Sequence, residues 1–185
     1  MGVYRARDLL RVPGLLSLSR VPLAAAFPFA LERPVAALAI IATAGLSDVL
    51  DGWYARRFDE VTPTGAAIDP LTDKIFVLVV AVSLVVSGRL SVLDVVMLSS
   101  REIMELPLVL WIGTSRARKL RAASASANLT GKLATVLQFA AATAALFRAP
   151  HLRWLIGAAA SSGLFAGGAY WLRFARHTRP VAPGA

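Results

Sequence analysis

The sequence predicts an all-α integral membrane protein, and three features point to that fold: its apolar composition, its long apolar segments and the placement of its basic residues. Of the 185 residues, 57% are hydrophobic and only 17% are charged, and the mean hydropathy is +0.63. A soluble domain is closer to half apolar and carries about a quarter charged residues. Because so little polar surface would not keep a chain of this length in water, we expect a single helical membrane domain over residues 1–185.

Six apolar segments are long enough to cross a bilayer, which takes about 20 helical residues each. The predicted spans are Leu15–Leu31, Val35–Arg57, Ala66–Ser87, Val92–Gly113, Leu129–Phe147 and Leu152–Arg173. Proline, glycine or charged residues interrupt the apolar pattern between consecutive spans, as is typical of loops. These interruptions are Glu32-Arg33-Pro34, Val61-Thr62-Pro63-Thr64-Gly65, Gly88-Arg89, the basic run after Gly113, and Ala149-Pro150.

Two further segments lie outside the predicted spans. Over Tyr4–Val12, Arg5, Arg7 and Arg11 alternate with apolar residues, which predicts a short amphipathic helix on the membrane surface. The tail over residues 180–185 is rich in Pro and Ala, and we expect it to be disordered.

The basic residues gather at one set of span ends. Twelve Lys and Arg residues flank one side of the predicted membrane, and four arginines flank the other. The positive-inside rule therefore places both termini in the cytoplasm. The net charge of +9 is explained by topology and by attraction to anionic lipids, so nucleic acid is not an expected partner. The Ala- and Arg-rich composition with few lysines suits a bacterium of high genomic GC content, so the expected location is the bacterial inner membrane.

Any metal site in this chain must use carboxylates. The sequence has no cysteine and only two histidines, which lie far apart, so thiolate or histidine zinc sites are not expected. Oxygen ligands favour hard cations such as Mg²⁺ or Mn²⁺.

Four aspartates lie at the cytoplasmic ends of the second and third spans. Asp48 and Asp51 are three residues apart, and Asp69 and Asp73 are four apart, so each pair lies on one face of its helix. The short connection over residues 57–64 makes the two helices antiparallel neighbours, and we expect their acidic faces to turn toward each other. Ionisable residues inside membrane segments are candidates for function.

The chemistry that suits this cluster is displacement at phosphorus. Four close carboxylates repel one another unless cations separate them, and two divalent ions would form a two-metal site. The small residues Gly52, Ala55 and Gly65 would let a pyrophosphate or a flat base approach the backbone, and Arg56 offers a forked donor for phosphate. In the alternative interpretation, the aspartates pair with Arg56, Lys74 or Arg101 and only stabilise the bundle.

The pattern Asp48-x-x-Asp51-Gly52-x-x-Ala55-Arg56, eight residues, Gly65-x-x-x-Asp69-x-x-x-Asp73 resembles at every position the signature of the CDP-alcohol phosphatidyltransferase family. The resemblance implies a dimeric bundle of six transmembrane helices that uses CDP-diacylglycerol and opens its site to the cytoplasmic interface. It implies that all four aspartates bind metal and that Asp73 is also the general base. Together with Asp48 and Asp51, the residues Gly52, Ala55, Arg56 and Gly65 would bind the CDP group.

Weaker resemblances concern the subgroup and the acceptor alcohol. The segments Val12–Arg20, Asp69–Lys74, Ser100-Arg101-Glu102 and Gly131–Gln138 are similar to segments of phosphatidylglycerophosphate and cardiolipin synthases. Within these segments Arg101 and Lys132 are cations suited to the phosphate of an acceptor. The alternatives are an i,i+4 pair of Arg101 with Glu105 and a snorkelling role for Lys132.

Glycerol 3-phosphate is the preferred acceptor, which would give a phosphatidylglycerophosphate synthase. Phosphatidylglycerol is the alternative acceptor, which would give a cardiolipin synthase. Two other functional classes are a transporter whose acidic cluster binds a cation and a catalytically inactive scaffold. The matched glycines and arginine argue against the transporter, because ion passage does not require their spacing, and the four intact aspartates argue against the scaffold.

Overall fold

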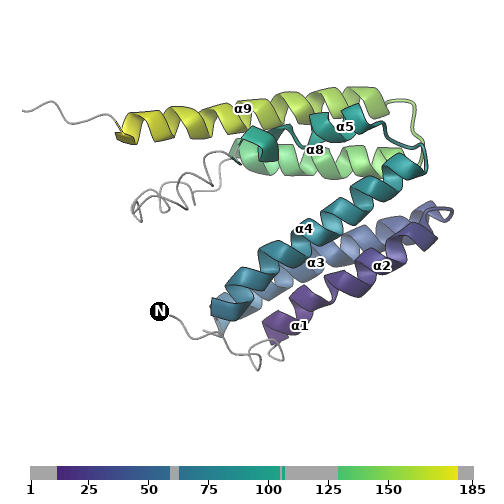
Figure 1. The fold of residues 1–185 in the computed structure, drawn as a ribbon, viewed down its shortest axis with the longest axis horizontal. Coiled ribbons are helices and arrows are strands. Elements are labelled where there is room, and N and C mark those ends of the chain that lie inside the picture. Colours follow the sequence, from purple (N-terminus) through teal and green to yellow (C-terminus); the bar gives the residue numbers. More distant parts are fainter. Residues whose placement is uncertain (1–11, 59–62, 105, 107–128, 179–185) are drawn as a thin grey trace, which may run out of the picture. The chain divides into compact units, whose positions relative to one another are not determined.

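All regular secondary structure that the structure describes is helical. The computed structural model describes residues 12–58, 63–104, 106 and 129–178, and no strand occurs within these ranges (Figure 1). The all-α prediction is therefore confirmed for this part of the chain. The helices form two compact units, Met1–Arg89 and Leu90–Ala185, called the first and the second unit below.

The first unit contains four helices. They are α1 (Val12–Leu18), α2 (Arg20–Ala30), α3 (Pro34–Arg57) and α4 (Pro63–Val86). The chain reverses direction after α2 and again after α3, so the start of α2, the end of α3 and the start of α4 lie at the same end of the unit (Figure 1). Both α1 and α2 pack against α3 and against α4, so the N-terminal helices contact both acidic helices.

The first predicted span, Leu15–Leu31, is divided into α1 and α2 at Ser19. Pro22 explains the interruption, because it has no N–H to bond the Leu18 carbonyl four residues earlier. The Ser19 hydroxyl instead donates to the Leu16 carbonyl over 2.6 Å. Ser19 keeps helical backbone angles, with φ −60° and ψ −22°, so the two helices continue in nearly the same direction.

The second and third predicted spans agree closely with α3 and α4. Pro34 occupies the first turn of α3, where a missing N–H costs nothing. The end of α4 is set by Gly88, whose φ of +67° suits glycine. The Gly88 and Arg89 amides donate back to the Val85 and Leu84 carbonyls, which completes a Schellman motif.

The second unit contains α5 (Val92–Leu98), α8 (Leu129–Leu146) and α9 (Leu152–Thr178), with α9 packed against the other two. A further helical stretch covers residues 100–104. The fourth predicted span, Val92–Gly113, is thus interrupted at Ser99, where the Leu98 carbonyl accepts a hydrogen bond from the Gln138 side chain over 2.7 Å. The fifth and sixth spans correspond to α8 and to a longer α9.

Some predictions fall on residues outside the described ranges. These are the surface helix over Tyr4–Val12, apart from Val12 itself, the second half of the fourth span, and the tail over residues 180–185.

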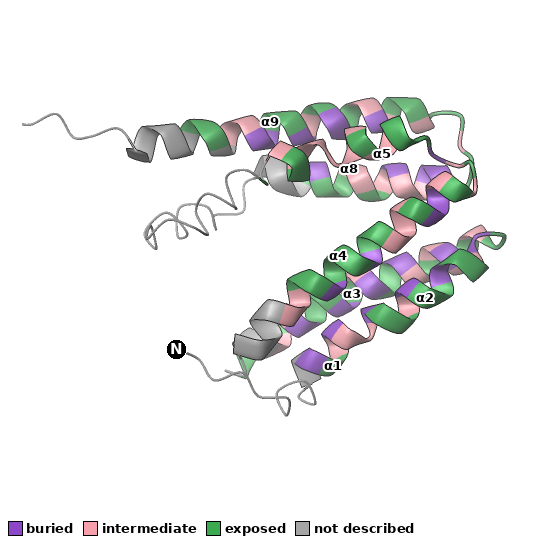
Figure 2. Cartoon of the chain, viewed as in Figure 1, coloured by how far each residue is buried: buried purple, intermediate pink, exposed green. Residues whose placement is uncertain are grey.

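Many buried positions hold alanine, while many large apolar residues are exposed, and Figure 2 shows buried and exposed positions along the same helices. The buried residues include ten alanines: Ala24, Ala37, Ala44, Ala134, Ala141, Ala144, Ala145, Ala159, Ala160 and Ala166. By contrast, Phe29 is 89% exposed, Trp154 83% and Phe165 80%. Exposed apolar side chains of this size are unlike those of a water-soluble bundle, although Phe27, Leu84 and Leu146 are buried as they would be there.

Within the described residues, one helix is both long enough and apolar enough to cross a membrane. It covers Pro34–Tyr54, and shorter apolar helices cover Gly14–Ala30 and Leu133–Leu146. The six-span count therefore stays a prediction.

Two glycines of α9 allow its close approach to residues 100–104. A Cβ atom on Gly163 would lie 2.7 Å from the Ser100 hydroxyl oxygen and 3.2 Å from the Arg101 backbone nitrogen. A Cβ atom on Gly167, one turn later, would lie 2.8 Å from the Met104 Cβ. Small residues at this spacing let helices approach closely, as in many membrane proteins.

We expect Gly163→Ala to lower the stability of the second unit by about 1–3 kcal/mol, because the added methyl group overlaps the Ser100 hydroxyl oxygen and crowds the Arg101 backbone. Gly168→Ala is the matched control, since a Cβ there meets nothing within 4 Å. In the control the better helix propensity of alanine should keep or slightly raise stability. Thermal unfolding in detergent measures both variants, and equal midpoints would contradict the predicted packing.

Candidate active site

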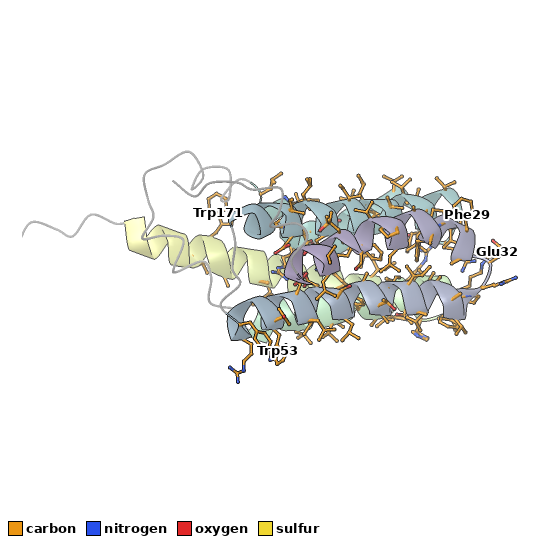
Figure 3. The ribbon with its side chains drawn as sticks, turned by 90° about the horizontal axis from the view of Figure 1, so that it is seen from below. Phe29, Glu32, Trp53 and Trp171 are labelled. Atoms are coloured by element: carbon orange, nitrogen blue, oxygen red, sulfur yellow. The ribbon has the colours of Figure 1, made fainter. Side chains whose placement is uncertain are left out.

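The aspartates of α3 and α4 lie at one end of the first unit. Asp48 and Asp51 are near the end of α3, and Asp69 and Asp73 are in the first half of α4. Figure 3 shows Trp53, close to Asp51 in sequence, at this end, and Phe29 and Glu32 at the other. The acidic cluster is thus separated from the α2–α3 turn by the length of the helices.

A buried arginine from α2 binds this cluster. Arg20 is 1% exposed, and its Nη2 atom lies 2.5 Å from Asp51 Oδ2 and 3.0 Å from Asp48 Oδ1. Its Nη1 atom donates toward α4, 3.4 Å from Thr72 Oγ1 and 3.5 Å from the Asp69 carbonyl oxygen. Arg20 therefore connects α2 to both acidic helices.

Ser17 of α1 brings the two acidic helices together. Its Oγ atom lies 3.1 Å from Asp51 Oδ2 and 2.5 Å from Asp69 Oδ1. The carboxylates of Asp51 and Asp69 therefore face each other, as the sequence predicted. A serine hydroxyl has a single hydrogen, so it donates to only one of the two carboxylates at a time.

The cluster extends from a buried interior to an open edge. The Asp51 side chain is buried, Asp69 is half-buried and Asp73 is exposed. The Asp48 side chain is 58% exposed although it pairs with Arg20. Asp73 and Asp48 therefore form the exposed edge of the cluster.

The local backbone explains why Ser17 and Arg20 act together. They are three residues apart, and the helical conformation of Ser19 keeps them on one face across the interruption between α1 and α2. Asp48 and Asp51 are likewise one turn apart on α3. The interacting side chains thus come from matched helical faces.

The chemistry of the side chains fits divalent cations, although the described arrangement does not form a coordination cage. The carboxylates of Asp48, Asp51 and Asp69 share one buried guanidinium and one hydroxyl hydrogen, so negative charge and acceptor atoms are in excess. Mg²⁺ and Mn²⁺ prefer such hard oxygen ligands. Among the described residues, no three carboxylate or histidine side chains are close enough to hold one ion.

In the alternative interpretation, the aspartates pair with Arg56, Lys74 or Arg101, but the structure gives them a different partner. Within the described residues, Asp48 and Asp51 do form ion pairs, and the partner is Arg20. The sequence prediction did not include this arginine.

The predicted CDP-binding residues are placed in part. Gly52 follows Asp51 on α3 and is half-buried. Ala55 and Arg56 belong to α3 and Gly65 to α4, but their side chains lie outside the described part of the structure.

The predicted acceptor-binding residues belong to the second unit. The Arg101 Nη1 atom donates to Thr135 Oγ1 of α8 over 3.2 Å. Lys132 lies on α8 one turn before Thr135, but its side chain lies outside the described part of the structure. Glu105, the alternative partner of Arg101, lies wholly outside it. Next to this pair, the Gln138 amide donates to the Glu102 carboxylate, with distances of 3.2 and 3.3 Å.

Sequence reasoning assigned no role to Ser17, Arg20 or Thr72. A usable signal was present for Arg20, because a charged residue inside an apolar segment requires a partner of opposite charge. That rule identified the aspartates, and it applies equally to an arginine in the first apolar segment. Ser17 and Thr72 gave no such signal, since hydroxyl groups also bond to their own helix.

In a comparison with known protein families, residues 10–166 match the CDP-alcohol phosphatidyltransferase family. The chain belongs to this family. The match includes most of both units and all four aspartates. It confirms the family membership that the aspartate pattern predicted.

Similar members of the CDP-alcohol phosphatidyltransferase family fall under two names. A CDP-diacylglycerol–glycerol-3-phosphate 3-phosphatidyltransferase from Pectobacterium atrosepticum is 32% identical over 157 residues, which are 80% of this chain and 84% of the relative. The protein of the same name from Escherichia coli is 32% identical over 74% of this chain and 77% of the relative. A cardiolipin synthase (CMP-forming) from Rattus norvegicus is 34% identical over 55% of this chain.

The extent of the match differs among these three relatives. The matched region is about a third of the rat protein's length (34%). It is about three quarters or more of the Pectobacterium and Escherichia proteins.

Proposed function

We propose that this chain is a membrane enzyme that transfers a phosphatidyl group from CDP-diacylglycerol to glycerol 3-phosphate and releases CMP. The observation that carries the proposal is the meeting of Asp51 from α3 and Asp69 from α4 at Ser17. Both aspartates belong to the family pattern, and their separation of 18 positions is closed only by the fold. Membership of the family supports the same reaction class.

The membrane location is supported by the distribution of side chains. Outward faces with large apolar residues and helix contacts with alanine and glycine suit a lipid environment. At about 1.5 Å per residue, the 24 residues of α3 are roughly 36 Å long, enough for a hydrocarbon core of about 30 Å. We further propose that the chain crosses a bacterial inner membrane six times and forms a homodimer. Both termini and the site would lie in the cytoplasm.

The proposed metal ligands are Asp48, Asp51, Asp69 and Asp73, which would hold two divalent cations, Mg²⁺ or Mn²⁺. When bound, such ions would offset negative charge on a pyrophosphate group. The CDP group would be bound by Asp48 and Asp51 together with Gly52, Ala55, Arg56 and Gly65. Half-buried Gly52 adds no side chain beside buried Asp51, which leaves the backbone accessible at the cluster.

Asp73 is proposed as the general base. It is exposed one turn after Asp69, so the hydroxyl group of an acceptor can reach its carboxylate. The acceptor oxygen would attack the phosphorus that carries diacylglycerol, the bond from that phosphorus to the CMP oxygen would break, and Asp73 would take the hydroxyl proton. No covalent enzyme intermediate is needed.

The acceptor is proposed to be bound by Arg101 and Lys132. A guanidinium and an ammonium group both suit a phosphate monoester, and Thr135 already contacts Arg101. Glycerol 3-phosphate is favoured because the Pectobacterium and Escherichia relatives named for it match 80% and 74% of this chain, whereas the rat cardiolipin synthase matches 55%. Phosphatidylglycerol remains the second candidate.

A lipid-product assay tests this function. Purified protein receives CDP-diacylglycerol and Mg²⁺, with glycerol 3-phosphate or phosphatidylglycerol offered separately, and the lipid products and CMP are measured. We expect phosphatidylglycerophosphate and an equal amount of CMP, with the first acceptor only.

Two other outcomes would contradict the proposal at different levels. Cardiolipin formed only with phosphatidylglycerol would change the acceptor and keep the reaction class. An absence of CMP release with either acceptor, in protein shown to be folded, would reject the transferase and favour a cation-binding transporter.

A further inference from the structure

The guanidinium that partly offsets the charge of the aspartate cluster contacts two of the carboxylates that are proposed to hold a metal ion. Arg20 Nη2 lies 2.5 Å from Asp51 Oδ2 and 3.0 Å from Asp48 Oδ1, and both aspartates are proposed metal ligands. A guanidinium and a divalent cation held at the same two carboxylates repel each other, so each weakens the binding of the other. Arg20 and the metal therefore compete for one site.

We propose that Arg20 is the resident counter-ion of the aspartate cluster and gives up Asp48 and Asp51 when divalent cations bind. This inference rests on the proposed metal site. Arg20 is a positioning residue in this role, because it acts on the metal ligands rather than on the substrate.

Burial explains why a resident counter-ion is needed. The Asp51 side chain is only 6% exposed, and a buried carboxylate without a partner is strongly destabilising. Asp48 and Asp69 add negative charge to the same region. With Arg20 in place, α2, α3 and α4 can pack before any divalent ion arrives.

The bonding of Arg20 also explains how it could release the carboxylates. Its Nη1 atom has separate contacts on α4, with Thr72 and the Asp69 carbonyl oxygen, which do not depend on Asp48 or Asp51. Its buried Nε atom has no hydrogen-bond partner among the described residues. The guanidinium thus has a second anchor and an unused donor, and a rotation can free Nη2 while Nη1 stays on α4.

Ser17 makes the exchange local. Its hydroxyl lies within hydrogen-bond distance of both Asp51 and Asp69, so it can donate to either carboxylate from α1 when Arg20 moves. The expected change is therefore a side-chain movement within an assembled cluster.

The test measures Mn²⁺ binding and thermal unfolding of the full-length protein in detergent, without substrate. Free Mn²⁺ is followed by electron paramagnetic resonance, and unfolding is recorded in EDTA and in saturating Mn²⁺. In Arg20→Met we expect Mn²⁺ to bind about tenfold more tightly, because a competing positive charge a few ångströms away is removed. The midpoint in EDTA should fall, and its rise on adding Mn²⁺ should exceed that of the wild type.

Arg89→Met is the matched control. Arg89 is a buried arginine of the same unit that donates to the Leu31 carbonyl over 2.6 Å. The eleven residues of α2, a length of roughly 16 Å, separate Arg20 from Leu31, the partner of Arg89. This variant should lose stability and keep the Mn²⁺ affinity of the wild type.

The outcomes separate this inference from the proposed function. If the wild type binds no Mn²⁺, the metal site of the proposed function fails. If the wild type binds Mn²⁺ and folded Arg20→Met binds it equally or more weakly, the counter-ion role fails while the metal site stands.

If Arg20→Met does not fold, the wild type still provides a test. The ¹⁵Nε resonance of Arg20, assigned with Arg20→Lys, should shift as Mg²⁺ saturates the protein. A resonance that saturating Mg²⁺ leaves unchanged would overturn the inference.

Discussion

Asp73→Asn should reduce turnover about 10²–10⁴-fold, because an amide cannot accept the proton of the acceptor hydroxyl. The substitution keeps the size of the side chain, and Asp73 is exposed, so the fold should persist. Binding of CDP-diacylglycerol should be largely retained, since Asp48, Asp51 and Asp69 remain. The measurements are the rate of CMP release and, separately, the binding of CDP-diacylglycerol.

Asp94→Asn provides the matched control for this substitution. Asp94 lies in the capping box of α5, where its carboxylate accepts bonds from the Ser91 amide and hydroxyl, and asparagine can accept in the same place. The control should therefore keep near-normal turnover. Turnover like that of the wild type in Asp73→Asn would reject Asp73 as the general base.

Removal of divalent cations should abolish activity, with a loss of about a thousandfold or more. The expected size follows from the several kcal/mol of charge stabilisation that a metal centre supplies, since each 1.4 kcal/mol is a factor of ten in rate. Activity should return on adding Mg²⁺ or Mn²⁺ to the dialysed protein. The measurement is CMP release as a function of free cation concentration.

EDTA already saturated with Mg²⁺ is the control for this experiment, because it carries the same chelator without removing metal. It should leave activity unchanged. Full activity in metal-free buffer would exclude the two-metal site and leave the four aspartates without their proposed role.

Most helices could be predicted from the sequence, because apolar segments bounded by proline, glycine and charge reflect local interactions. The boundaries of α3, Pro34–Arg57, differ by one residue from the predicted span, and Gly88 ends α4 near the predicted break. The two interruptions, at Ser19 and Ser99, were not predicted. One depends on the amide that Pro22 lacks, and the other accompanies a bond from Gln138, 40 positions away.

The sequence by itself determined which carboxylates share a helical face, because spacings of three and four residues fix neighbours on a helix. It also determined the family, through the pattern from Asp48 to Asp73. Only the tertiary structure decided that Ser17 and Arg20 complete the cluster. Arg20 meets Asp51 across 31 positions, and Ser17 meets Asp69 across 52. Helical periodicity carries no information over such separations, because these contacts depend on how α1 and α2 pack against α3 and α4.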